Sequence, residues 1–265
     1  MCLAFDARPP ELPVDLALPP LAGGAGAEIL ELTSEDGTRF SAALAESPSA
    51  SPEATGVVIL PDVRGLYRFY LELAERFAQA GHHAIAIDYF GRTAGTGERD
   101  ADFDFWPHVE RTSVEQVQAD AAAAIQELRE RTGVEAVVTV GFCFGGLHSF
   151  LAATSAELDL AGVVGFYGAL DGTRLGAPSP PDHTGDMRCP VLGLFGGADA
   201  GIPLERVDAF ERGMAAAGVE HEVVTYPGAP HSFFDRSFEE HAEACTDAWR
   251  RVLGFLERVG APVAR

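Results

Sequence analysis

The sequence predicts an α/β fold in which helices cover both faces of a mostly parallel central sheet. Short apolar runs alternate with longer segments whose apolar residues recur at helical spacing, which is the pattern of repeated βα units. A composition of 47% hydrophobic and 22% charged residues is typical of a globular protein with a substantial core. A length of 265 residues suits one α/β domain, so we expect residues 28–265 to form a single domain after an irregular N-terminal arm, residues 1–27.

Eight short segments are predicted to form the strands of this sheet. The first two flank Glu35, Asp36 and Gly37, a turn sequence typical of a β-hairpin. The other six are short and mainly apolar, as expected of strands that are buried inside a sheet. The predicted strands are residues 28–33, 38–45, 57–60, 84–87, 136–140, 162–166, 191–195 and 222–225.

Five segments carry apolar residues at helical spacing, namely residues 66–80, 114–131, 147–156, 204–217 and 238–259. Two further stretches fit neither period. Residues 91–109 contain Phe103, Phe105 and Trp106, and residues 171–189 are rich in Gly, Pro and Asp. Loops of this length in a compact domain are often lids or binding loops, although aromatic residues in such a stretch more often pack into the core.

The net charge excludes several classes of function. A formal charge of −21 at pH 7 gives no positive surface to attract nucleic acid or anionic lipid, and no apolar run is long enough to span a membrane. The cysteines are Cys2, Cys143, Cys189 and Cys245, without zinc-site spacing or a preceding signal peptide. We therefore expect a cytoplasmic protein, a monomer or small homo-oligomer, with no metal. No nucleotide-binding motif is present, so no cofactor is expected.

The chemistry concentrates at residues 141–145, Gly-Phe-Cys-Phe-Gly, which lie between a predicted strand and a helix. A G-x-C-x-G sequence in this context is typical of a nucleophile elbow, since the sharp turn leaves no room for side chains two residues from the nucleophile. The helix N-terminus also favours the thiolate of Cys143. The alternative interpretation is a buried structural cysteine in a glycine-rich turn.

Two further residues complete a catalytic set at the same edge of the predicted sheet. Asp199 follows the strand 191–195, and His231 follows the strand 222–225. Active sites of parallel α/β sheets gather at the carboxyl ends of the strands, and the order nucleophile, acid, histidine is that of α/β-hydrolases. Taken separately, Asp199 is also explained as a turn or cap residue and His231 as a surface loop histidine.

Three segments resemble the dienelactone hydrolase family of the α/β-hydrolase superfamily: Gly-Phe-Cys-Phe-Gly-Gly at 141–146, Gly-Gly-Ala-Asp at 196–199 and Gly-Ala-Pro-His-Ser-Phe at 228–233. The resemblance extends from about residue 28 to the C-terminus. It implies an α/β-hydrolase fold and a Cys-His-Asp triad of Cys143, His231 and Asp199. Such a triad opens a carboxylic ester or lactone through a thioester acyl-enzyme.

The resemblance also implies roles for residues around the triad. The backbone N–H groups of Val63 and Phe144 would form the oxyanion hole. Asp62 stands where the family has a glutamate that holds the resting cysteine; it is one methylene shorter, and it equally suits a cap for the following helix. Arg92 matches an arginine that binds the substrate carboxylate, with a solvated loop arginine as the alternative.

One position departs from the family pattern. The second carboxylate-binding arginine of the family falls at Asp235, and Arg236 follows one place later. The sequence therefore predicts an ester or lactone hydrolase but leaves its small-molecule substrate open among dienelactones, other lactones and neutral esters. A thiol redox sensor or a non-hydrolytic ligand-binding protein built on the same site is the alternative function.

Overall fold

The computed structural model describes residues 6–16, 26–51, 54–97, 99–235 and 237–261. Part of the predicted N-terminal arm, residues 1–5 and 17–25, lies outside the described residues. The arm's described segment, residues 6–16, contains neither helix nor strand. It lies against the C-terminal helix, where the indole N–H of Trp249 donates to the carbonyl of Pro10 at 3.3 Å.

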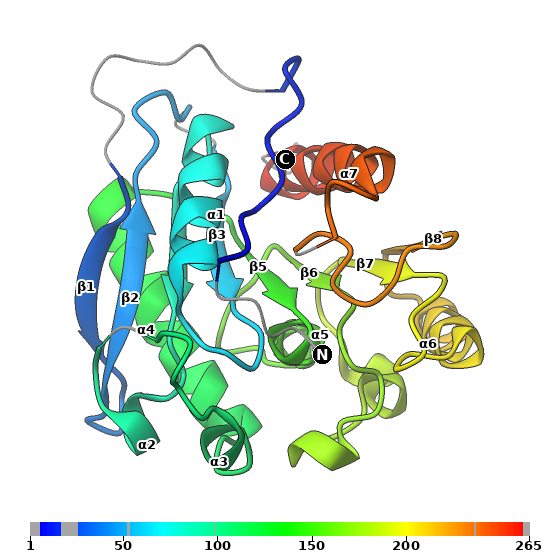
Figure 1. The fold of residues 1–265 in the computed structure, drawn as a ribbon, viewed down its shortest axis with the longest axis horizontal. Helices are drawn as coiled ribbons and strands as arrows, with labels where there is room; N and C mark the ends of the chain where they lie inside the picture. The colour runs from blue at the N-terminus through cyan, green and yellow to red at the C-terminus, as the bar shows by residue number, and fades with distance from the viewer. Residues whose placement is uncertain (1–5, 17–25, 52–53, 98, 236, 262–265) are drawn as a thin grey trace.

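One sheet of eight strands runs through the molecule in the order β1-β2-β4-β3-β5-β6-β7-β8 (Figure 1). β2 pairs antiparallel with β1 and β4, and all pairs from β4 through β3 to β8 are parallel. This arrangement confirms the predicted fold class. The strands are β1 (Glu28–Thr33), β2 (Arg39–Ala45), β3 (Gly56–Leu60), β4 (Ala84–Ile87), β5 (Val137–Phe142), β6 (Gly162–Phe166), β7 (Val191–Gly196) and β8 (His221–Tyr226).

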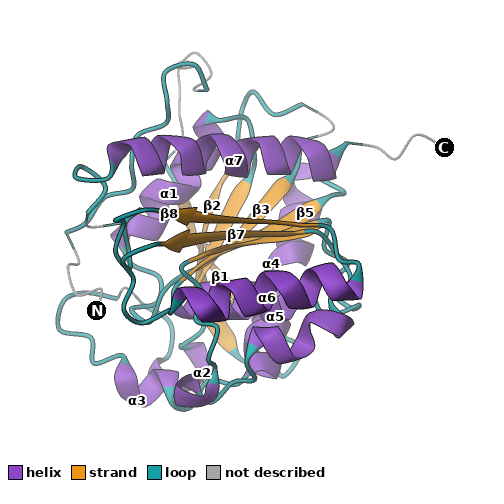
Figure 2. Ribbon diagram, turned by 90° about the vertical axis from the view of Figure 1, so that its right-hand side faces the viewer, coloured by secondary structure: helices purple, strands orange, loops and turns teal. Residues whose placement is uncertain are grey.

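Helices cover both faces of the sheet (Figure 2). α1 (Arg68–Gln79) and α7 (Ala242–Gly260) lie on one face, and α4 (Val114–Thr132), α5 (Phe144–Ala152) and α6 (Leu204–Ala217) lie on the other. The alternating side chains of β3 show why both faces need cover. Val57 and Ile59 pack in the cluster that contains the α1 core residues, whereas Val58 packs in the cluster that contains those of α4.

Two helices begin at residues other than those predicted from the sequence. α5 begins at Phe144, three residues before the predicted start, because the elbow turns directly into the helix through Gly145 and Gly146. α7 begins at Ala242 instead of residue 238, since residues 231–235 and 237–241 form turns. By contrast, α4 starts where expected, with a capping box between Ser113 and Gln116.

The two stretches in which apolar residues show neither helical nor strand spacing contain short helices. Residues 91–109 hold α2 (Gly91–Ala94) and α3 (Trp106–Val109). Residues 171–189 hold the 3₁₀ helices η1 (Thr173–Leu175) and η2 (Pro180–Asp186). Helices this short carry too few turns to show an apolar period in the sequence. No helix in the part of the chain that the structure describes is long and apolar enough to cross a membrane.

Candidate active site

Cys143 lies at the turn from β5 into α5 and has a strained backbone, with φ 54° and ψ −108°. Its N–H donates to the carbonyl of Phe166 on β6 at 3.0 Å, which fixes the turn against the sheet. The flanking glycines are required by contact. A Cβ at Gly141 would lie 2.0 Å from the carbonyl oxygen of Gly145, and one at Gly145 would lie 2.0 Å from that of Leu60. The half-buried thiol is thus held at the head of a helix.

Asp199 and His231 form a hydrogen-bonded pair beside this turn. Asp199 follows β7 and His231 follows β8, and Nδ1 of His231 lies 2.6 Å from Oδ2 of Asp199. The other carboxylate oxygen accepts from the N–H of Gly201 at 2.8 Å. Burial alone would raise the pKa of Asp199, but the hydrogen bond and charge of His231, with the backbone N–H groups of Gly201 and Ile202, outweigh it and lower the pKa below its ordinary value.

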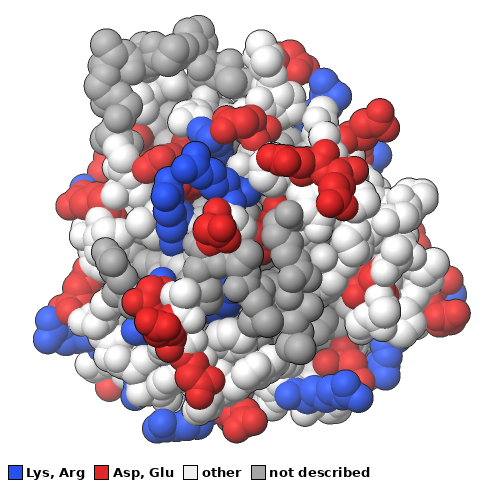
Figure 3. All heavy atoms as spheres, viewed as in Figure 1, with Lys and Arg blue, Asp and Glu red and all other residues white. Residues whose placement is uncertain are grey.

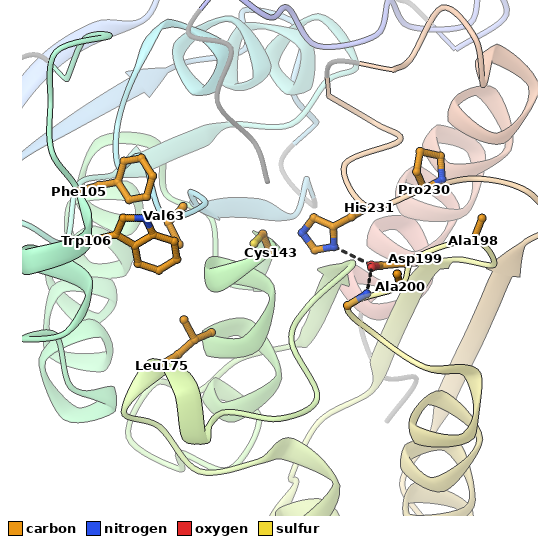
Figure 4. A pocket seen from close by; sticks show the side chains of 11 residues that line it. Val63, Phe105, Trp106, Cys143, Leu175, Ala198, Asp199, Ala200, Pro230 and His231 are labelled. Atoms are coloured by element: carbon orange, nitrogen blue, oxygen red, sulfur yellow. Dashed lines mark hydrogen bonds and ion pairs between the residues drawn. The ribbon is translucent and has the colours of Figure 1, made fainter.

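Cys143, His231 and Asp199 line one cavity of about 440 Å³. Figure 4 shows the imidazole between Cys143 and Asp199, with Val63, Phe105 and Trp106 on the other side of Cys143. The three elements that follow β5, β7 and β8 therefore deliver their side chains to a single site, as the strand order predicts. The described lining residues are Val63, Phe105, Trp106, Cys143, Leu175, Ala198, Asp199, Ala200, Gly201, Pro230 and His231.

The loop after β3 carries Val63 to this cavity and is held by two buried tyrosines. The hydroxyl of Tyr89 donates to the carbonyl of Pro61. The hydroxyl of Tyr70 accepts from the N–H of Asp62 at 2.8 Å and donates to Oδ2 of the same residue, also at 2.8 Å. These bonds fix the peptide units just before Val63. Phe144, the other expected oxyanion donor, is the first residue of α5.

Asp62 belongs to a buried charge cluster that the sequence interpretation missed. Nε of Arg64 donates to Oδ1 of Asp62 at 2.9 Å, and Nη2 lies 2.5 Å from Oδ2 of both Asp62 and Asp235. The side chain of Arg64 is 0% exposed and both carboxylates are 2% exposed. Burial alone would lower the pKa of Arg64, but Asp62, Tyr67 and Asp235 reverse this and raise it, so the guanidinium stays charged.

The structure does not bring Arg92 to the cavity. Arg92 is on α2, where its guanidinium binds Asp36 at 2.8 Å and Asp120 at 2.6 Å. Asp120 is fully buried, so this pair fastens α2 to α4. Arg236 lies outside the described residues. Among the residues that are described, no cluster of three or more His, Cys, Asp and Glu side chains is placed to hold a metal ion.

A family model described as the dienelactone hydrolase family matches residues 40–260. The chain belongs to the dienelactone hydrolase family. A protein of Escherichia coli O157:H7 that is assigned as a carboxymethylenebutenolidase is 32% identical over 214 residues, which cover 77% of each chain. A Salmonella typhimurium protein with the same assignment is 33% identical over 225 residues, covering 80% of this chain and 81% of the relative. Membership of this family makes the protein a hydrolase.

Solved structures agree with this family. A crystal structure from Klebsiella pneumoniae, assigned as a dienelactone hydrolase, superposes with a TM-score of 0.74 at 28% identity and covers 87% of this chain and 99% of its own. A puromycin-hydrolyzing peptidase of Mycobacterium tuberculosis has a TM-score of 0.72 at 20% identity, covering 92% of this chain and 41% of its own. The second likeness shows the shared α/β-hydrolase fold alone.

Proposed function

We propose that this member of the family hydrolyses a carboxylic ester or lactone with Cys143 as nucleophile, His231 as general base and acid, and Asp199 as the residue that orients His231. One observation carries the proposal. The thiol at the strained turn and the hydrogen-bonded His231–Asp199 pair line the same cavity. A nucleophile, a base and a residue that orients the base are the parts that covalent acyl transfer needs.

The first half of the reaction forms a thioester. Sγ of Cys143 attacks the carbonyl carbon as its proton passes to Nε2 of His231, and the backbone N–H groups of Val63 and Phe144 bind the oxygen that becomes negative. The C–O bond of the ester then breaks, and His231 returns the proton to the leaving oxygen. Asp199 accepts the hydrogen bond from Nδ1 throughout, which stabilises the imidazolium.

The second half consumes water. Water attacks the thioester carbon while His231 takes one of its protons, and the same two N–H groups again bind the oxyanion. The C–S bond breaks, the acid is released, and the proton returns to the sulfur of Cys143. The partial positive charge at the N-terminus of α5 stabilises negative charge on Sγ in both halves.

Replacement of the nucleophile tests the proposal. The Cys143→Ala variant should lose at least about 10³-fold in kcat for 4-nitrophenyl acetate, and mass spectrometry should find no acyl adduct. Cys245→Ser is the matched control, because burial raises the pKa of the Cys245 thiol to about 12 and serine retains the hydrogen bond to the carbonyl of Phe233. Unchanged turnover in Cys143→Ala contradicts the proposal. Acylation without turnover in the unmodified protein contradicts the proposed hydrolase and indicates a reactive sensor thiol, whereas neither acylation nor turnover contradicts it and indicates a ligand binder.

A further inference from the structure

The first arginine that the resemblance assigns to a substrate carboxylate is held by the protein itself. Besides Asp36 and Asp120, the guanidinium of Arg92 donates to the hydroxyl of Ser34 at 3.2 Å, and its side chain is only 10% exposed. Binding a substrate would require Arg92 to leave Asp120 as an unpaired charge with 0% exposure. Arg92 is therefore a structural ion-pair residue, fixed away from the cavity.

The residue at the second expected carboxylate-binding position, Asp235, is negatively charged and is also engaged in an ion pair. Asp235 stands where the resemblance implies a second carboxylate-binding arginine, and its Oδ2 accepts from Arg64 at 2.5 Å. Arg64 in turn holds Asp62 through both Nε and Nη2. A substrate carboxylate near this cluster would meet two existing carboxylates that already share one buried cation. The cluster holds the loop of Val63 beside the turn of His231, and it offers no receptor for an anion.

The cavity wall opposite Asp199 is apolar. In Figure 4, Phe105, Trp106 and Leu175 lie on the far side of Cys143 from the His231–Asp199 pair. Among the described lining residues there is no lysine and no arginine. Trp106 is 42% exposed, which leaves an aromatic surface at this wall available for contact with a ligand.

The position of His231 decides which part of an ester meets this wall. In an open-chain ester the leaving oxygen takes its proton from His231, so the alcohol part lies on the His231 side of Cys143. The acyl part then extends to the opposite side, against Phe105, Trp106 and Leu175. An apolar acyl chain gains free energy by covering this surface, whereas a carboxylate placed there loses hydration without gaining a partner.

The net charge of the whole molecule also disfavours an anionic substrate. The chain carries a formal charge of −21, and Figure 3 shows acidic side chains distributed over the face seen in Figure 1, with basic side chains among them. An anionic substrate therefore approaches against a repulsive long-range field unless the site supplies cations locally. Arg64 and Arg92, the two arginines at or near the family's carboxylate contacts in the described chain, are both engaged in internal ion pairs.

We propose that the substrate is an ester or lactone with an uncharged, apolar acyl group, and that the site disfavours the carboxylate-bearing acyl group of a dienelactone. This inference rests on the proposed hydrolase function. It follows from the inverted charge at residue 235, the internal pairing of Arg92 and the apolar wall formed by Phe105, Trp106 and Leu175.

A matched pair of esters tests the proposal. 4-Nitrophenyl hexanoate and the mono-4-nitrophenyl ester of adipic acid have the same leaving group and a six-carbon acyl chain, and they differ in a terminal methyl or carboxylate. The value of kcat/KM should be at least about tenfold higher for the hexanoate, a difference of ~1.4 kcal/mol in transition-state stabilisation. Equal values, or a preference for the adipate ester, overturn the proposal while the proposed hydrolase function stands. No turnover of either ester or of 4-nitrophenyl acetate overturns the proposed function and this inference with it.

A change of charge at the wall tests its location. Leu175→Arg places a cation where the acyl group is expected, and Leu175→Gln is a polar control without charge. The adipate-to-hexanoate ratio of kcat/KM should be at least about tenfold higher in Leu175→Arg than in Leu175→Gln, because a neighbouring cation offsets the loss of hydration of the carboxylate. Equal ratios in the two variants contradict the placement of the acyl group at this wall.

Discussion

Replacing Arg64 by methionine should strongly destabilise the protein, because it leaves two buried carboxylates without their shared cation. The side chains of Asp62 and Asp235 are each 2% exposed, and each lies 2.5 Å from Nη2 of Arg64. Methionine fills much of the same volume but cannot donate a hydrogen bond. The variant therefore removes the charge while it keeps most of the packing.

The size of the effect follows from the burial. Removing one partner of a buried ion pair lowers the free energy of unfolding by about 3–5 kcal/mol, and we take about 4 kcal/mol as the central value. The entropy of unfolding is about 2.1 cal/mol/K per residue, or ~0.56 kcal/mol/K for 265 residues. A loss of 4 kcal/mol then lowers Tm by about 7 °C.

Thermal unfolding followed by circular dichroism measures this shift. Arg68→Met is the matched control, since Arg68 is 62% exposed and its pair with Glu72 should change Tm by no more than about 1 °C. Adding Asp235→Asn to Arg64→Met should restore at least ~1 kcal/mol, because one of the two buried negative charges that Arg64 neutralised is gone. A Tm within about 2 °C of the unmodified protein in Arg64→Met would refute the assigned energetic role of the cluster.

Three further predictions concern other parts of the site and its support. His148 is buried, and within the described chain neither of its ring nitrogens has a hydrogen-bond partner, so burial lowers its pKa to about 3. Below about pH 6.5 the unfolded chain gains a proton at this residue that the native state does not. The free energy of unfolding therefore falls by ~1.4 kcal/mol per pH unit as pH decreases. Urea titrations from pH 7 to 4.5 measure this pH dependence of the free energy of unfolding. His148→Leu should lose the part of the slope that corresponds to one proton, whereas the control Leu151→Met should keep it. An equal slope in all three proteins contradicts the assignment. Asp199→Asn should lower kcat for 4-nitrophenyl acetate by about 10³-fold or more, since the amide cannot stabilise the imidazolium of His231, and a kcat close to that of the unmodified enzyme argues against the triad. Gly145→Ala should lower Tm by more than about 5 °C because of backbone clash. In the control Gly254→Ala on α7, the new Cβ meets no atom of the described chain within 4 Å beyond its own helix backbone and chain neighbours, so Tm should stay unchanged or rise slightly. Similar Tm values for the two variants would show that the turn has room for a side chain.

The sequence was sufficient for the sheet and for the positions of the triad candidates. Buried strands such as β3 are continuous apolar runs, and that property is visible without any tertiary information. Cys143 and Asp199 follow buried strands, and His231 follows the partly buried β8, so their common edge could be inferred from the order of the elements. The first residue of α5 was harder to predict from the sequence. Gly145 and Gly146 are poor helix formers, but the contacts of the elbow place them in α5.

Charge pairing was the part that sequence spacing could not predict. The partners of Arg92, Asp36 and Asp120, are 56 and 28 residues away, and their contacts depend on how α2 packs against the turn between β1 and β2 and against α4. Arg64 and Asp235 are 171 residues apart. A usable signal existed at residue 235, because an aspartate in place of an expected arginine requires a compensating cation if it is buried.

The negative charge at residue 235 and the buried guanidinium of Arg64 belong to one ion-pair cluster. With Asp235 in place of an arginine, the cluster would hold two buried carboxylates and no cation, unless a guanidinium reached it from elsewhere; Arg64 supplies that guanidinium from the same loop that carries Val63. The ion pair of Arg64 with Asp235 links the loop of Val63 to the turn of His231, which supports the proposed catalytic geometry. Arg64 has 0% exposure, so its cation is not available to a substrate. The proposed triad and the proposed preference for an uncharged acyl group are therefore compatible with the same buried ion-pair cluster.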